Sequence, residues 1–102
     1  MLTLQKIADK KTLFKLYGDQ MQDREIRSEI NEILTSCRPN VPPGAVLFVR
    51  KLRLKEVVIF LYKNDVPNGY VLSEPLQLKV SEYKEQIEKE KALQHQIKKL
   101  KL

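Results

Sequence analysis

The longest apolar stretch of the chain, residues 45–60, is interrupted near its middle by a basic cluster. The cluster consists of Arg50, Lys51, Arg53 and Lys55. Runs rich in β-branched and aromatic residues favour extended chain that is buried on at least one face. The pattern predicts strands over residues 45–52 and 56–63. A single long bent strand is the alternative, because the intervening turn contains no Gly, Asn or Pro.

A third strand is predicted over residues 70–80, where apolar and polar residues alternate toward the end of the segment. The preceding turn contains Asn68-Gly69, a pair suited to positive φ. Pro75 cannot donate to a sheet ladder, so this strand is expected at an edge or with a bulge. The three strands would form an antiparallel meander.

The apolar run at residues 57–62 is expected to be the central strand of that sheet. It has no polar residue on either face, whereas a sheet with one solvated face shows alternation. Ile59 and Phe60 point to opposite faces of such a strand, so both faces should be covered. We expect the second predicted helix, residues 23–37, to cover one of them, and either the C-terminal helix or another chain to cover the other.

The clearest helical pattern lies in residues 23–37. Asp23 is a natural N-cap, and Arg38 precedes Pro39, which ends the helix because a residue before proline avoids the α region. Its apolar stripe, at i, i+4, i+7, i+8 and i+11, is Ile26, Ile30, Ile33, Leu34 and Cys37.

A first helix is predicted over residues 4–17, with Thr3 as N-cap and Gly18 after its end. The polar triplet at residues 9–11 interrupts its apolar pattern. A helix that begins only near Lys10 is therefore the alternative.

The last helix is predicted over residues 82–101, with Ser81 as N-cap. Four acids and two lysines lie in residues 82–90, and four lysines and no acid follow from Lys91 onward, which complements the helix dipole. One heptad register places Tyr83, Glu90 and Ile97 at a, and Gln86, Leu93 and Leu100 at d. Two of the six are polar, so the seam is weak. The helix either packs on its own sheet through Tyr83 and Ile87, or projects so that its distal half contacts another chain.

These elements predict a single α+β domain over residues 1–102 in the order α-α-β-β-β-α. A helical pair spans residues 1–38, and a proline-rich connector spans 39–44. A three-stranded antiparallel meander packed against the helices spans 45–80, and the long C-terminal helix spans 81–102.

Composition narrows the class of protein. The chain carries a net charge of +6 and a single cysteine, Cys37, so an internal disulfide is excluded and a reducing compartment is favoured. Neither a secretory signal nor an apolar run of about 20 residues is present, so we expect a cytoplasmic protein with no membrane span. The mild basic excess permits an anionic partner and selects none.

No catalytic, cofactor or metal motif is apparent. His95 and Cys37 are the sole histidine and cysteine and lie in different elements, whereas zinc needs about four N or S ligands. Cys37 lies on the apolar stripe of its helix and is expected to be a small core residue. The three glycines are too far apart for a phosphate loop. We therefore expect a protein that is not an enzyme and needs neither cofactor nor metal.

Two interaction hypotheses follow. In the first, the chain is an assembly or protein-interaction module. It binds a partner chain or self-associates through its C-terminal helix and sheet surface, with Leu93, Ile97 and Leu100 as the contact residues. In the alternative, it is a small nucleic-acid-binding accessory protein that uses the basic cluster, with help from lysines near the C-terminus. On a strand, Lys51, Arg53 and Lys55 would share one face, and closely spaced cations favour phosphates. Against this, the same cations can simply solubilise a sheet edge.

Overall fold

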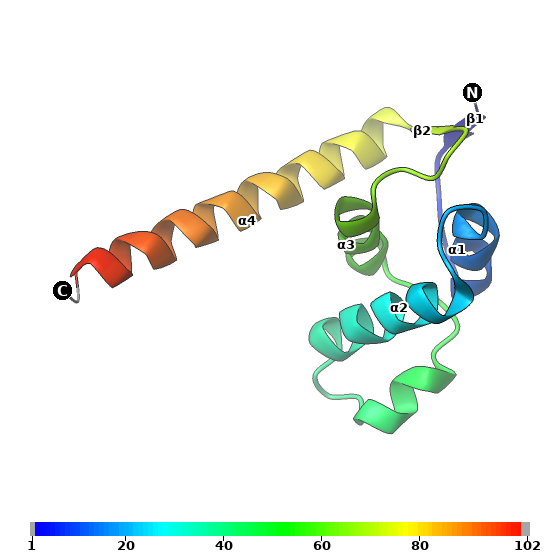
Figure 1. Ribbon diagram of the computed structural model, residues 1–102, viewed down its shortest axis with the longest axis horizontal. Helices are drawn as coiled ribbons and strands as arrows, with labels where there is room; N and C mark the ends of the chain where they lie inside the picture. The colour runs from blue at the N-terminus through cyan, green and yellow to red at the C-terminus, as the bar shows by residue number, and fades with distance from the viewer. Residues whose placement is uncertain (1, 101–102) are drawn as a thin grey trace.

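The computed structural model describes residues 2–100, and the side chains of residues 2–42 and 44–93. The chain forms an α+β domain with a two-stranded sheet, α-helices and a 3₁₀ helix η1 (Figure 1). The elements are β1 (Leu2–Leu4), α1 (Lys10–Tyr17), α2 (Asp23–Cys37), η1 (Pro43–Phe48), α3 (Leu54–Asn64), β2 (Tyr70–Leu72) and α4 (Glu74–Leu100).

The predicted antiparallel meander is wrong. In the described residues the sheet pairs β1 with β2 in parallel, with Leu2 opposite Tyr70 and Leu4 opposite Leu72. Residues 45–52 contain the end of η1 rather than a strand, and residues 56–63 lie inside α3. Of residues 70–80, the first three form β2 and residues 74–80 belong to α4. A short run that is apolar at every position has no periodicity that distinguishes a buried strand from a helix buried on all sides. The strand prediction for this segment failed for that reason.

Helix α3 lies at the centre of the body, packed between α2 and α4 (Figure 1). Every side chain from Glu56 to Leu61 is buried, so the prediction that this segment is covered all round is confirmed, although its backbone is helical. The helix begins with half of a capping box, in which a carboxylate oxygen of Glu56 accepts a hydrogen bond from the Arg53 backbone N–H at 2.7 Å.

The predicted helix at residues 23–37 is confirmed as α2, although Gln22, not Asp23, is its N-cap. For the first helix, the alternative prediction of a start near Lys10 is correct, since α1 begins at Lys10. Asp9 is its N-cap and accepts hydrogen bonds from the Thr12 backbone N–H at 2.9 Å and the Thr12 hydroxyl at 2.7 Å. The predicted start at residue 4 with Thr3 as N-cap is wrong, because Thr3 and Leu4 lie in β1 and residues 5–8 form a connection without regular secondary structure.

Helix α4 begins eight residues earlier than predicted, so Ser81 lies inside it rather than at its cap. Pro75 does not mark a strand edge. It lies in the first turn of α4, where a missing N–H costs little because those N–H groups have no intrahelical partner. Gly69 has φ 85°, which confirms the predicted turn before β2.

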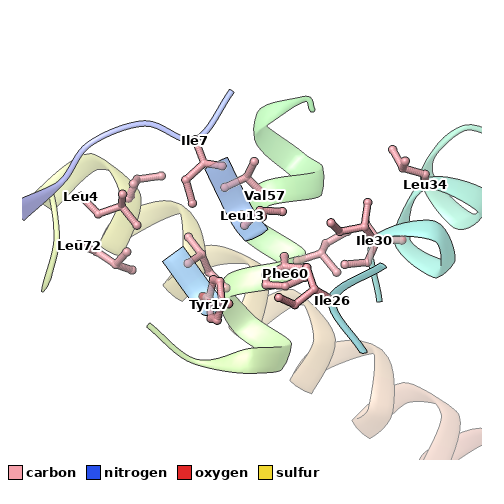
Figure 2. Close-up of a cluster of buried hydrophobic side chains, with 14 of the residues drawn as sticks. Leu4, Ile7, Leu13, Tyr17, Ile26, Ile30, Leu34, Val57, Phe60 and Leu72 are labelled. Atoms are coloured by element: carbon pink, nitrogen blue, oxygen red, sulfur yellow. The ribbon is translucent and has the colours of Figure 1, made fainter. Parts of the chain in front are cut away.

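The core is formed where α1, α2 and α3 meet, and it continues to the sheet and the start of α4 (Figure 2). Phe60 lies beside Tyr17 and Ile26, and its ring meets that of Tyr17 edge-on with centroids 4.9 Å apart. Leu4 and Leu72, one from each strand, close the sheet end of the cluster. The predicted stripe of α2 is confirmed as core for its isoleucines and Leu34, and Cys37 is half-buried at its margin.

Candidate interaction surfaces

The first half of α4 packs on the body. Leu76 is buried, Tyr83 is half-buried, and its ring meets that of Tyr62 on α3 edge-on with centroids 5.3 Å apart. Lys79 and Glu82 form an exposed ion pair on the same helix at 3.7 Å. Ile87 is half-buried one turn later. This half of the helix is therefore part of the folded domain.

Beyond Ile87 the helix leaves the body. Every side chain from Glu88 to Leu93 is exposed, and Leu93 is 59% exposed. Figure 1 shows this half of α4 extending away from the other helices, and the domain measures 48 × 36 × 22 Å along its principal axes. Leu93 is thus available at the surface. Ile97 and Leu100 lie in α4, but their side chains are outside the described residues.

The structure separates the members of the predicted basic cluster, although all four are exposed. Arg50 lines a groove beside α1 and α2, Lys51 lies next to the connection before α1, and Lys55 faces the groove between α3 and α4. The predicted single-faced stripe is wrong, because it assumed a strand where the chain forms a connector and the first turn of a helix. Binding of nucleic acid by these residues stays a prediction.

A buried ion pair that the sequence did not reveal holds α2 to α3. The Arg38 guanidinium donates two hydrogen bonds to the Glu56 carboxylate, at 2.7 Å and 2.8 Å, and a third to the Lys51 carbonyl at 3.1 Å. Glu56 is 2% exposed. Burial acts to raise the pKa of this carboxyl, but the hydrogen bonds from Arg38 and Arg53 outweigh burial and lower it. Both carboxylate oxygens of Glu56 accept hydrogen bonds from groups inside the protein, so the pair has a structural role.

Cys37 has no reactive environment. Burial, followed by the negative charge of Glu56, raises the pKa of its thiol, so the thiol is protonated at neutral pH and is a weak nucleophile. The imidazole of His95 lies outside the described side chains. Among the side chains that are described, no three of His, Cys, Asp or Glu are grouped closely enough to hold a metal ion.

A groove lies between α1, α2 and the end of η1. This open groove has a volume of about 620 Å³ and continues into a smaller cavity of about 110 Å³ that shares four of its lining residues. Together the two run along α2 from Asp23 to Asn31. The shared residues are Lys10, Phe14, Arg27 and Leu47.

The walls of this groove are held together by hydrogen bonds. The Lys10 ammonium donates to the Val46 carbonyl at 3.0 Å, and Val46 is itself buried. The Lys10 backbone N–H donates to the Arg50 carbonyl at 3.0 Å, and the Leu52 N–H donates to the Ala8 carbonyl at 2.8 Å. The Arg27 guanidinium lies 5.9 Å from the centroid of the Phe14 ring. The groove is therefore preformed.

The chain matches no protein-family model, no curated protein and no solved structure. Within the described residues, no helix combines the length and the apolar character needed to cross a bilayer.

Proposed function

We propose that the protein is a non-enzymatic assembly module that self-associates by pairing the distal half of α4 with the same segment of a second copy. One observation carries the proposal: α4 continues past the body as a helix whose side chains are exposed from Glu88 to Leu93. At ~1.5 Å per residue, residues 88–100 extend about 20 Å. Isolated helices of about this length are marginal in water, so a second helix packed alongside would stabilise it.

The sequence of this half supplies one apolar seam. Leu93, Ile97 and Leu100 are spaced i, i+4 and i+7, which places them on the same side of a helix. The remaining positions from residue 88 to residue 100 are polar or charged except Ala92. A seam this narrow fits one partner helix rather than the face of a globular core.

Charge distribution favours an antiparallel pair. Glu88 and Glu90 lie at the start of the distal half, whereas Lys98 and Lys99 lie near its end, with no acid between Lys91 and Leu100. In antiparallel orientation, Glu88 and Glu90 of each helix, which alternate with Lys89 and Lys91, would lie near Lys98 and Lys99 of the other. A parallel pair would bring the lysines together and would be disfavoured by like-charge repulsion.

The proposal is tested by sedimentation of the full chain between about 10 μM and about 1 mM, where a short two-helix contact would associate. We expect a reversible monomer–dimer equilibrium that Leu93→Asp with Ile97→Asp abolishes, while the far-UV circular dichroism of the body is retained. A monomer at all concentrations would contradict self-association.

The matched control is Ala92→Asp with His95→Asp. These changes add the same two charges to the same segment, but away from the predicted seam, and should leave the dimer in place. If both double variants dissociate it equally, general charge repulsion rather than the Leu93–Ile97 seam explains the loss. If dimers persist in both, another surface mediates association.

A further inference from the structure

The groove between α1, α2 and η1 carries cations that form no ion pair with the acids whose side chains are described. Its basic lining residues are Lys10, Lys11, Arg27 and Arg50. The ion pairs among the described side chains are Arg38–Glu56 and Lys79–Glu82, and neither involves the groove. Helix α1 contributes Lys10 and Lys11 to the lining, and it contains no acid.

The two acids of the groove each lie at the start of a helix. Asp9 caps α1 and accepts two hydrogen bonds from Thr12. Asp23 lies in the first turn of α2, where the helix dipole favours negative charge. The lining of the groove therefore carries a net formal charge of +2, from four cations and two carboxylates.

An apolar floor accompanies this charge. Phe14 and Val49 are half-buried, and Leu47 lines both cavities while remaining 58% exposed. The next residue, Phe48, is 82% exposed. Large apolar side chains concentrated in one place on a protein surface, rimmed by polar groups, are typical of binding sites.

We infer that this groove binds an acidic peptide segment of another protein that inserts an apolar side chain against Leu47 and Phe14. The four cations, which form no ion pair among the described side chains, select carboxylates, and the apolar floor selects a peptide side chain over a simple polyanion. The nine residues from Asp23 to Asn31 on α2 cover eight helical rises, about 12 Å, which accommodates about four residues of extended peptide. The concave, preformed shape suits an inserted side chain better than a flat membrane surface.

The test measures fluorescence anisotropy of a short fluorescein-labelled peptide, rich in Asp and Glu with one Phe and one Leu at its centre, at low salt. We expect binding that weakens as salt is added. One comparison peptide replaces its Phe and Leu with Ala, and another replaces its acids with Lys. Both should bind about tenfold more weakly or not at all. Absence of binding by the acidic apolar peptide would overturn the inference.

Charge variants locate the site. Lys11→Glu with Arg50→Glu should weaken binding by about tenfold or more, because two rim cations become repulsive. Lys15→Glu with Arg24→Glu makes the same change in net charge on exposed residues of α1 and α2 that do not line the groove, and should have little effect. Equal losses in both would mean that only overall charge matters and would refute the site.

Leu47→Ser tests the apolar floor. It should weaken binding of the acidic apolar peptide and leave binding of the comparison peptide with Ala in place of Phe and Leu unchanged. Single-stranded DNA and phosphatidylserine vesicles serve as rival probes. If either binds as tightly as the peptide and loses binding in the Lys11/Arg50 variant, the groove is a site for that partner instead. The α4 variant Leu93→Asp with Ile97→Asp should bind the peptide normally, because the distal half of α4 extends away from the helices that line the groove (Figure 1).

Discussion

Helix α3 and the distal half of α4 are both helical, but for opposite reasons. Three consecutive residues of α3, Val57 to Ile59, are β-branched and are poor helix formers because their χ1 rotation is restricted. They are nevertheless helical, and every side chain from Glu56 to Leu61 is buried. Tertiary packing therefore determines the conformation of α3 against its intrinsic preference.

The distal half of α4 shows the reverse balance. It is composed mainly of Glu, Lys, Gln, Ala and Leu, all good helix formers, but its side chains are exposed from Glu88 to Leu93. Local propensity favours the helix, and nothing in the described part of the chain packs on it there. The comparison shows that helix content alone does not identify where a protein is stable.

The largest expected effect is at the centre of α3. Phe60 is 1% exposed and packs against Tyr17, so Phe60→Ala should lower the free energy of unfolding by about 3–5 kcal/mol. Urea denaturation followed by circular dichroism measures this loss. Leu93→Ala is the control and should change it by less than about 0.5 kcal/mol in the monomer. Similar losses for the two would mean that both regions belong to one cooperative core.

An intermediate effect is expected at the ion pair that fixes α3 to α2. Arg38→Met leaves the buried Glu56 carboxylate without its two guanidinium hydrogen bonds and should cost about 1.5–3 kcal/mol. The exposed pair on α4 offers the contrast, because Lys79→Met should cost less than about 1 kcal/mol. Equal costs in denaturant titrations would show that burial does not strengthen the Arg38–Glu56 pair.

The same pair predicts a pH dependence. The pKa of Glu56 is lowered in the folded state from its ordinary value of 4.5, so its contribution to stability is present above that value and is lost as the pH falls through the folded pKa. Between about pH 5 and about pH 3, the wild type should lose more unfolding free energy than Glu56→Gln, which cannot be protonated. An equal acid slope in both would contradict the assignment.

The smallest effect is expected in the distal half of α4. Ala92→Gly costs the local helix about 1 kcal/mol. Because α4 is outside the body at Ala92, global stability should change by less than about 0.5 kcal/mol. In the wild-type monomer, amide hydrogen exchange should be fast from residue 88 onward. Ala92→Gly should accelerate it further in that segment and leave the exchange rates in α3 unchanged. A global loss near 1 kcal/mol would mean that the distal segment unfolds together with the core.

Local signals were enough to predict several features. The stripe of α2 and its end before Pro39 depend on periodicity and on a steric rule that acts between neighbours. The turn at Gly69 depends on the freedom of glycine at positive φ. The exposure of Leu93 agrees with the thin apolar pattern of the last helix. In each case the deciding interactions lie within a few residues of the chain.

The candidate sites divide in the same way. The seam on α4 could be proposed from spacing, because Leu93, Ile97 and Leu100 share one helix. The groove could not, because its lining comes from α1, α2 and the end of η1, and its residues are up to 41 positions apart between Asp9 and Arg50. The sequence did not reveal the Arg38–Glu56 pair, because Glu56 is predicted in a strand and Arg38 only as the residue that ends its helix before Pro39.

The sequence by itself determined which segment would be buried, where α2 begins and ends, and that the last helix would carry little apolar surface. The tertiary structure alone decided that residues 54–64 are a helix. A run that is apolar on every side satisfies a central strand and a central helix equally, because both bury all of its side chains. Packing between α2 and α4, with Glu56 joining the first turn to Arg53 and Arg38, selects the helix, and those contacts exist only in the folded chain.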